Sequence, residues 1–219
     1  MINFNGTLSI EKFIDTALYN NKFGYYSQNN PFGKRGDFLT SPLISPLFSE
    51  IISVWVISYW IKLGKPKHFS FVELGPGNGE FCKTFCKTLK SFPEFKKTVK
   101  IYLLEKSQKL ASIQKNLIKE KNVVWIKSLG QIKKGPVLFF GNEFFDSIPI
   151  KQFVIKNSTI YEKYIKIENG RFERFILKKT SKQLIKELNN MRLMKKKGVI
   201  EYPQQGLKIL ELIVNKIQK

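Results

Sequence analysis

The sequence predicts an α/β fold, with a mostly parallel sheet, a helical N-terminal region and an antiparallel β insert. Two observations carry this prediction. Between residues 69 and 140, short and almost continuously apolar runs alternate with helical periodicity, which is typical of parallel strands covered on both faces. After Pro149 polar and apolar residues alternate along the chain, which is typical of antiparallel strands.

The first residues predict two helices separated by a loop. Ser9 can cap a helix over residues 11–20, where apolar residues recur at helical spacing. Residues 20–46 are rich in Gly and Pro and predict a loop. A long apolar helix is expected over residues 47–63, and Gly64-Lys65-Pro66 ends it.

Strands and helices are expected to alternate through the centre of the chain. The expected strands cover residues 69–74, 100–104, 123–126 and 136–140, and helices are expected over residues 80–89 and 107–119. Strands of the insert are expected over residues 152–156, 159–167 and 171–177, and helices over 181–194 and 206–219. We therefore expect three regions: 1–66, helical and lid-forming; 67–150, the ligand-binding half of the parallel sheet; and 151–219, the insert with C-terminal helices.

Composition excludes several classes of protein. The chain has 219 residues, 42% of them hydrophobic, which argues against a disordered segment or a small disulfide scaffold. Cys82 and Cys86 are spaced to share one helix face, so we expect free thiols. His68 is the only histidine, which leaves no Ser-His-Asp arrangement and no expected metal site.

The charge of +21 allows two interpretations. It could bind nucleic acid or an anionic surface through electrostatics. It could equally reflect an AT-rich genome, because nearly all the cations are lysines spread along the chain. No specific nucleic-acid partner is expected. The longest apolar run, residues 51–61, is shorter than the ~20 residues that span a bilayer, and no targeting pattern opens the chain, so a cytoplasmic location is expected.

The strongest local motif follows the strand over residues 69–74 and opens a helix; it reads Glu73-Leu74-Gly75-Pro76-Gly77-Asn78-Gly79. Glycines there let the backbone turn and approach a ligand. The spacing departs from the G-x-G-x-x-G dinucleotide pattern, and no phosphate-loop Lys follows. An acid before the first glycine, Glu73, favours a ligand with an ammonium group. S-adenosylmethionine (SAM) fits, since it carries an amine and no phosphate; a purely structural turn is the alternative.

Polar residues follow two further strands. Glu105 ends the second strand, where an acid can accept both hydroxyls of a ribose in an open α/β sheet. Asn142, Glu143 and Asp146 follow the fourth strand and could orient a guanidinium or an attacking nitrogen. The alternatives are a solvated loop carboxylate and simple capping residues. Before the long helix, residues 33–45 could fold over a ligand as a lid.

Taken in order, these motifs resemble the MidA-like family of class I SAM-dependent methyltransferases. The resemblance covers about residues 10–153 and rests on Phe23-Gly24-Tyr25-Tyr26, Gly36-Asp37-Phe38-Leu39-Thr40-Ser41-Pro42, the glycine motif, Asn142-Glu143-Phe144-Phe145-Asp146, Pro149 and Gln152-Phe153. It implies a Rossmann-like fold, SAM as cofactor and methylation of an arginine in a partner protein. Mitochondrial members assist assembly of the respiratory NADH dehydrogenase, so one of its subunits is the implied partner.

The resemblance also implies roles for individual residues. Gly75, Gly77 and Gly79 would line the methionine end of the cofactor together with Glu73, and Glu105 would bind the ribose. Asn142 and Glu143 would flank the methyl group, with Asp146 beside them. Gly36, Asp37, Thr40 and Ser41 would close the site from the N-terminal side.

Two departures from the family pattern leave alternatives open. Leu43 stands where the family usually has an acid. Family members also continue beyond this length, so we expect the final strands of the family fold to be missing and a second chain to be able to cover the exposed sheet edge. A non-catalytic SAM-binding protein or assembly chaperone is therefore the second hypothesis, and a nonspecific nucleic-acid binder is the third.

Overall fold

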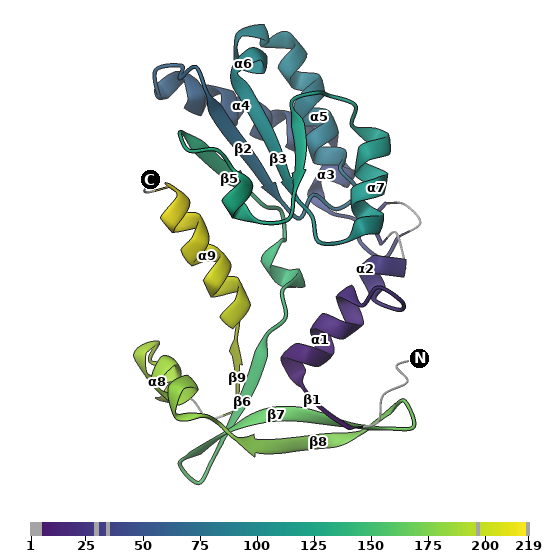
Figure 1. The fold of residues 1–219 in the computed structure, drawn as a ribbon, viewed down its shortest axis with the longest axis vertical. Helices are drawn as coiled ribbons and strands as arrows, with labels where there is room; N and C mark the ends of the chain where they lie inside the picture. Colours follow the sequence, from purple (N-terminus) through teal and green to yellow (C-terminus); the bar gives the residue numbers. More distant parts are fainter. Residues whose placement is uncertain (1–5, 29–30, 34–35, 196–197, 218–219) are drawn as a thin grey trace. The chain divides into compact units, whose positions relative to one another are not determined.

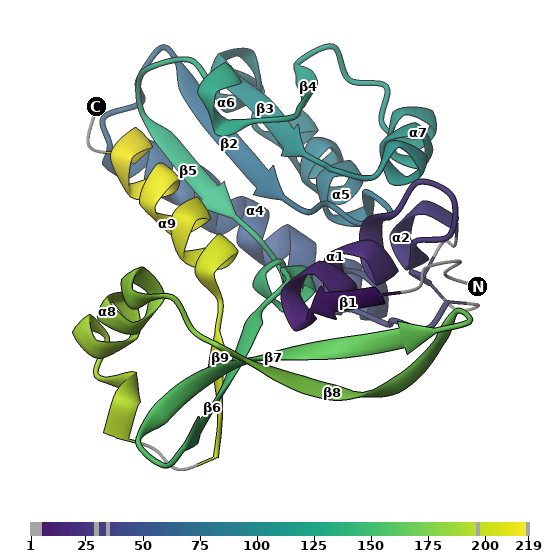
Figure 2. The same ribbon diagram turned by 60° about the horizontal axis from the view of Figure 1, so that its bottom comes forward.

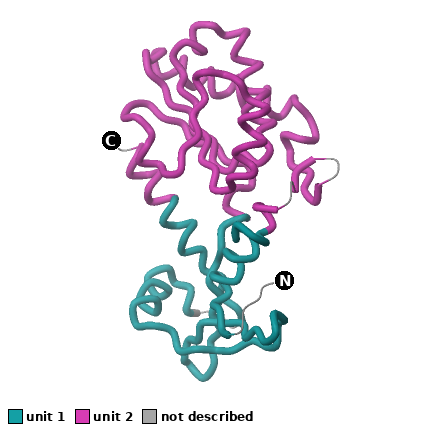
Figure 3. The backbone as a smooth tube through the Cα atoms, turned by 45° about the vertical axis from the view of Figure 1, so that its right-hand side comes forward, with its two compact units in different colours: residues 1–24, 147–209 teal, residues 25–146, 210–219 magenta. Residues whose placement is uncertain are grey.

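The computed structural model describes residues 6–28, 31–33, 36–195 and 198–217 (Figure 1). The chain forms two compact units (Figure 3). The first, called here the antiparallel-sheet unit, consists of Met1–Gly24 and Ser147–Ile209. The second, called the parallel-sheet unit, consists of Tyr25–Asp146 and Leu210–Lys219.

The parallel-sheet unit contains four strands in the order β4-β3-β2-β5, and each pairs parallel to its neighbour. The strands are β2 (Phe69–Leu74), β3 (Val99–Leu104), β4 (Val123–Ile126) and β5 (Val137–Phe140). In register, Phe71 lies between Ile101 of β3 and Leu138 of β5. Every residue of β2 is buried, as its nearly continuous apolar run predicts for a central parallel strand.

Helices cover this sheet and connect its strands. They are α2 (Tyr25–Gln28), α3 (Ser41–Ile44), α4 (Pro46–Lys62), α5 (Glu80–Thr88), α6 (Pro93–Thr98), α7 (Gln108–Leu117) and the C-terminal part of α9 (Gln204–Ile217). The core is rich in aromatic rings; the rings of Phe71 and Phe85 stack with centroids 4.4 Å apart. On α4, Val56 and Trp60 are buried in this core.

The opposite face of α4 is also apolar, although it is exposed; it carries Leu47, Ile51, Val54, Trp55 and Ile61.

In the described residues, β5 has β2 on one side and no strand on the other. Figure 2 shows the C-terminal part of α9 alongside β5, and Lys216 Nζ donates a hydrogen bond to the backbone oxygen of Ile132. The parallel sheet therefore ends at β5.

The antiparallel-sheet unit consists of a sheet in the order β1-β7-β6-β9, with β8 paired to β7. Its strands are β1 (Gly6–Ser9), β6 (Lys151–Lys156), β7 (Thr159–Glu168), β8 (Arg171–Lys179) and β9 (Val199–Tyr202), and its helices are α1 (Ile10–Tyr19) and α8 (Lys182–Asn190). Lys151 Nζ lies 2.7 Å from Glu11 Oε2 and 3.4 Å from Glu162 Oε1. These ion pairs connect α1 to β6 and β7.

The α/β fold with a parallel and an antiparallel sheet is confirmed. The free thiols are confirmed as well: Cys82 and Cys86 lie buried on α5. Sequence reasoning missed β1, β9 and α6, and it assigned residues 20–46 to a loop although α2 and α3 lie there. These elements are four to six residues long, too short to show a periodicity of their own. No helix among the described residues is long and apolar enough to cross a membrane.

We predict that Leu103→Ala lowers the free energy of unfolding of the parallel-sheet unit by about 2–5 kcal/mol, because Leu103 is 0% exposed and its removal leaves a cavity. All three tryptophans, Trp55, Trp60 and Trp125, lie in this unit, so urea unfolding followed by tryptophan fluorescence reports on it. Leu47→Ala is the matched control; Leu47 is 59% exposed, and a change of about 0.5 kcal/mol or less is expected. Equal effects of the two substitutions would contradict the assigned core.

Candidate functional site

The glycine turn between β2 and α5 lies at the carboxyl end of the parallel strands, where ligands bind in open α/β sheets. Gly75, Gly77 and Gly79 have φ values of +62°, +56° and +88°, in the left-handed region that other residues rarely adopt. The backbone N–H of Gly75 donates to the oxygen of Leu104 at 3.0 Å, which extends the pairing of β2 with β3 into the turn. The repeated glycines are therefore required by the backbone itself.

These glycines also have no room for a side chain. A Cβ on Gly75 would lie 2.7 Å from the ring of Phe144, and one on Gly77 would lie 3.3 Å from the ring of Phe32. A Cβ on Gly79 would lie 3.2 Å from both Gln114 Cγ and Ile118 Cδ1. The turn is thus packed on three sides by segments that follow β5, precede α3 and form α7.

A pocket opens at this turn, and all of its lining residues belong to the parallel-sheet unit. They are Phe32, Thr40, Pro42, Glu73, Gly75, Pro76, Gly77, Asn78, Phe81 and Asn142. Three segments thus meet there: the segment up to the start of α3, the glycine turn with its flanking residues, and Asn142 after β5. The sequence motifs predicted this meeting for Thr40, Glu73, Gly75, Gly77 and Asn142.

Glu73 is the most unusual group of the pocket. The residue is 4% exposed, and its Oε2 has no hydrogen-bond partner among the residues that the structure describes. Burial, together with the nearby charge of Glu105, raises the pKa of the Glu73 carboxyl to about 8. A cationic hydrogen-bond donor bound beside this buried group would satisfy the free oxygen and favour the ionised carboxylate.

Glu105 follows β3, and its carboxyl accepts hydrogen bonds from Ser107, Gln114 and the backbone of Lys106. Its Oε1 accepts from the backbone N–H of Ser107 at 2.7 Å, and its Oε2 accepts from Gln114 Nε2 at 3.0 Å. Burial raises the pKa of Glu105, and these hydrogen bonds oppose the rise. Glu105 does not line the pocket, but Gln114 links it to the glycine turn by donating to the oxygen of Gly77 at 2.7 Å.

The segment before α4 contributes an ordered turn. Gly36 leaves no room for a Cβ, which would lie 2.3 Å from the backbone oxygen of Pro31. Asp37 is exposed and accepts a hydrogen bond from the Tyr25 hydroxyl. Thr40 lines the pocket, whereas Ser41 begins α3 and does not line it.

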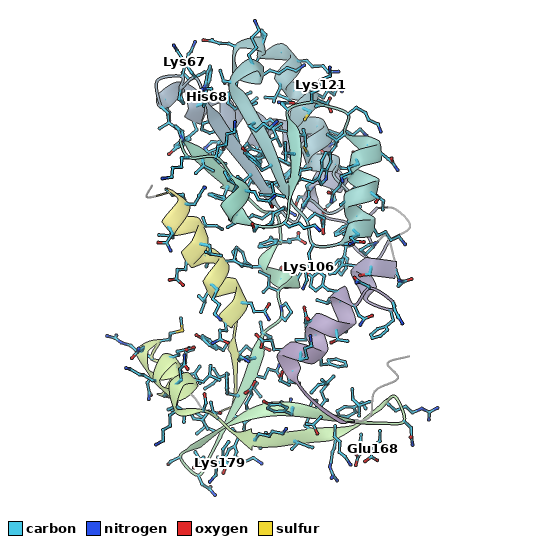
Figure 4. All side chains as sticks on the ribbon, in the orientation of Figure 1. Lys67, His68, Lys106, Lys121, Glu168 and Lys179 are labelled. Carbon is cyan, nitrogen blue, oxygen red and sulfur yellow. The ribbon has the colours of Figure 1, made fainter. Side chains whose placement is uncertain are left out.

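The residues after β5 divide into two groups. Asn142 lines the pocket, whereas Glu143 and Asp146 are exposed and do not. Glu143 has a φ of +55°, which is uncommon for a residue other than glycine and places local backbone strain beside Asn142. Figure 4 shows Lys106, next to Glu105, at the carboxyl end of the sheet and His68 at its other end, so His68 lies outside this site.

Sequence reasoning missed the aromatic and amide members of the site, notably Phe32, Phe81 and Gln114. Gln114 had a detectable signal, because it is a polar residue at an apolar position of a helix, four residues from both Leu110 and Ile118. Phe32 lies in a loop without periodicity, and its contact with Gly77 depends on tertiary folding.

Comparison with known proteins agrees with this geometry. Residues 51–219 match the Methyltransf_28 family, described as "Putative S-adenosyl-L-methionine-dependent methyltransferase". The chain belongs to this family. Its cofactor, by that description, is SAM, as the sequence motifs predict.

The names of curated relatives are more specific than the family description, because they also state the acceptor. The mouse protein named "Protein arginine methyltransferase NDUFAF7, mitochondrial" is 32% identical over an alignment of 176 residues that covers 69% of this chain and 40% of the relative. The human protein of the same name is 31% identical over 176 residues with the same coverage. The Caenorhabditis elegans homologue is 32% identical over 190 residues, 76% of this chain and 44% of the relative. The match thus spans less than half the length of these relatives.

A solved structure shows the same fold. A COG1565 superfamily member from Burkholderia thailandensis, bound to S-adenosyl-homocysteine, superposes with a TM-score of 0.76 at 21% sequence identity. The superposition covers 96% of this chain and 56% of that one. The class I methyltransferase fold is thereby confirmed.

We predict that Glu73 makes the stability of the parallel-sheet unit depend on pH. A carboxyl whose pKa is higher in the folded than in the unfolded protein binds more protons when folded, so stability falls as pH rises from the ordinary value of 4.5 to about 8 and then levels off. The expected slope approaches about 1.4 kcal/mol per pH unit. Urea unfolding by tryptophan fluorescence should show that Glu73→Gln removes this fall. The stability of the variant relative to the wild type should therefore increase as the pH rises from 4.5 to about 8. A constant difference between the two proteins from pH 5 to pH 8 would contradict the raised pKa.

Proposed function

We propose that this chain is a SAM-binding methyltransferase domain that transfers a methyl group to an arginine side chain of a partner protein. The observation that carries the proposal is the pocket at the glycine turn, where three left-handed glycines lie beside a buried acid with an unsatisfied oxygen. Membership of the family supports the cofactor. The names of the curated relatives support arginine as the acceptor.

The residues of the pocket suit the cofactor chemically. Gly75, Gly77 and Gly79 would let the backbone approach the amino-acid end, and the Glu73 carboxylate would neutralise its ammonium group. Glu105 would accept hydrogen bonds from the ribose hydroxyls. The cofactor, when bound, supplies a methyl group on a sulfonium. Asn142 would lie beside that group, because it lines the same pocket as the glycine turn.

The acceptor would be held by the chain's own carboxylates. Glu143 and Asp146 follow Asn142 on an exposed segment, where they would bind and orient a guanidinium entering from solvent. Thr40 and Ser41, with Gly36 and Asp37 before them, would close the pocket from the other side. Positioning is the main requirement, since methyl transfer is an in-line displacement. A subunit of the respiratory NADH dehydrogenase as acceptor, and a cytoplasmic location, stay predictions from the sequence.

The cofactor proposal is tested by calorimetric titration with S-adenosylhomocysteine. We expect Gly77→Val to abolish measurable binding, because the branched side chain requires a disfavoured backbone conformation and fills space next to Phe32 at the pocket. Gly64→Val is the matched control, since Gly64 also has a positive φ of +78° but has nothing within 4 Å of a Cβ and lies outside the pocket. Its affinity should stay within about twofold of the wild type. Absence of binding by the wild type would reject the proposal.

A second candidate, cofactor binding without methyl transfer, is favoured by one observation: Glu143 and Asp146 are exposed and outside the pocket lining. We expect transfer of a labelled methyl group from SAM to arginine-containing peptides by the wild type. Glu143→Gln should lower that transfer by about 10- to 100-fold through loss of a charge-assisted hydrogen bond, with unchanged affinity for S-adenosylhomocysteine. Glu94→Gln, an exposed acid of α6, is the control. Binding by the wild type with no methyl incorporation would favour the second candidate.

A further inference from the structure

Gln114 is a polar residue placed where the helix pattern requires an apolar one. It lies on α7, its side chain is 0% exposed, and its neighbours one turn away on either side, Leu110 and Ile118, are buried apolar residues. Burying an amide is unfavourable unless its donors and its acceptor are all satisfied. A leucine would fit the helix pattern better, so the amide calls for an explanation in terms of the groups it contacts.

The amide of Gln114 joins three segments of the parallel-sheet unit. Its Nε2 donates to the backbone oxygen of Gly77 at 2.7 Å and to Glu105 Oε2 at 3.0 Å. Its Oε1 accepts from Trp125 Nε1 at 2.9 Å. One side chain thus connects the glycine turn after β2, the acid after β3 and the strand β4.

Trp125 determines which way the amide points. An indole N–H can only donate, so the atom of Gln114 that faces it must be the oxygen. Both amide hydrogens are then directed at Gly77 and Glu105, and a flipped amide would place an N–H against the indole N–H. The three hydrogen bonds therefore hold the Gln114 amide in a single orientation.

The Glu105 carboxylate is consequently fixed at both ends. Gln114 holds Oε2, and the backbone N–H of Ser107 holds Oε1 at 2.7 Å. Each carboxylate oxygen can accept further hydrogen bonds, so both keep capacity for the two neighbouring hydroxyls of a ribose. The same amide holds the carbonyl of Gly77 in the middle of the glycine turn.

We propose that Gln114 is a positioning residue that aligns the Glu105 carboxylate with the glycine turn, so that the ribose hydroxyls and the amino-acid end of one ligand bind together. This inference rests on the proposed function, because it concerns the same cofactor. It assigns Gln114 no contact with the cofactor: the residue acts through Glu105 and Gly77. Removing the amide should therefore weaken recognition of the ribose hydroxyls specifically.

The experiment compares two ligands by calorimetric titration, S-adenosylhomocysteine and its 2′-deoxy analogue. In the wild type we expect the missing hydroxyl to weaken binding by about tenfold or more, because it removes a hydrogen bond to a charged group. Gln114→Met keeps an unbranched side chain of similar size and removes the amide. We expect it to weaken binding of S-adenosylhomocysteine by about tenfold or more, and binding of the analogue much less, so that the ratio of the two affinities falls toward one. Gln108→Met, an exposed position of the same helix, should leave the ratio unchanged.

The outcomes separate the possible explanations. If Gln114→Met weakens both ligands equally and keeps the ratio, the residue has only a structural role and the inference is wrong. If the wild type binds neither ligand, the proposed function itself fails. Should Gln114→Met not fold, Trp125→Phe is the second test, since it keeps an aromatic ring and removes the indole N–H that orients the amide, together with the rest of the five-membered ring. A reduced ratio in Trp125→Phe supports the inference, and an unchanged ratio overturns it.

Discussion

The backbone conformation at the end of β2 is the constraint on which the site depends. β2 is buried along its whole length, and the chain leaves the sheet in a tight turn directly after it. The left-handed conformations of Gly75, Gly77 and Gly79 make this possible, and the contacts of Phe144, Phe32 and Gln114 close around them. The position of every other residue of the pocket follows from that turn.

Electrostatics at the site oppose those of the whole chain. The protein carries a formal charge of +21, yet the buried Glu73 and the half-buried Glu105 lie near each other at the carboxyl end of the sheet. Burial raises the pKa of both carboxyls, and the charge of Glu105 raises that of Glu73 further. Ionising both groups destabilises the folded protein when no ligand is bound, and a nearby cation would reduce that cost. This is the physical link between the geometry and a sulfonium cofactor.

Two apolar surfaces of the parallel-sheet unit distinguish it from a closed α/β domain. The sheet ends at β5 in the described residues, and the exposed face of α4 carries large apolar side chains such as Ile51 and Trp55. A helix that is apolar on all sides is usually buried. The match spans less than half the length of the curated relatives.

The sequence by itself determined the regular elements and the glycine turn, because apolar runs, helical periodicity and glycine spacing are local properties of the chain. It located β2 and β4 correctly and brought Glu73, Gly75, Gly77, Thr40 and Asn142 into one predicted site. Only the tertiary structure decided that Phe32 packs on Gly77, that Glu143 and Asp146 stay exposed, and that Gln114 joins Gly77, Glu105 and Trp125. Those contacts join residues far apart in the chain, and side-chain packing between such residues leaves no periodic trace in the sequence.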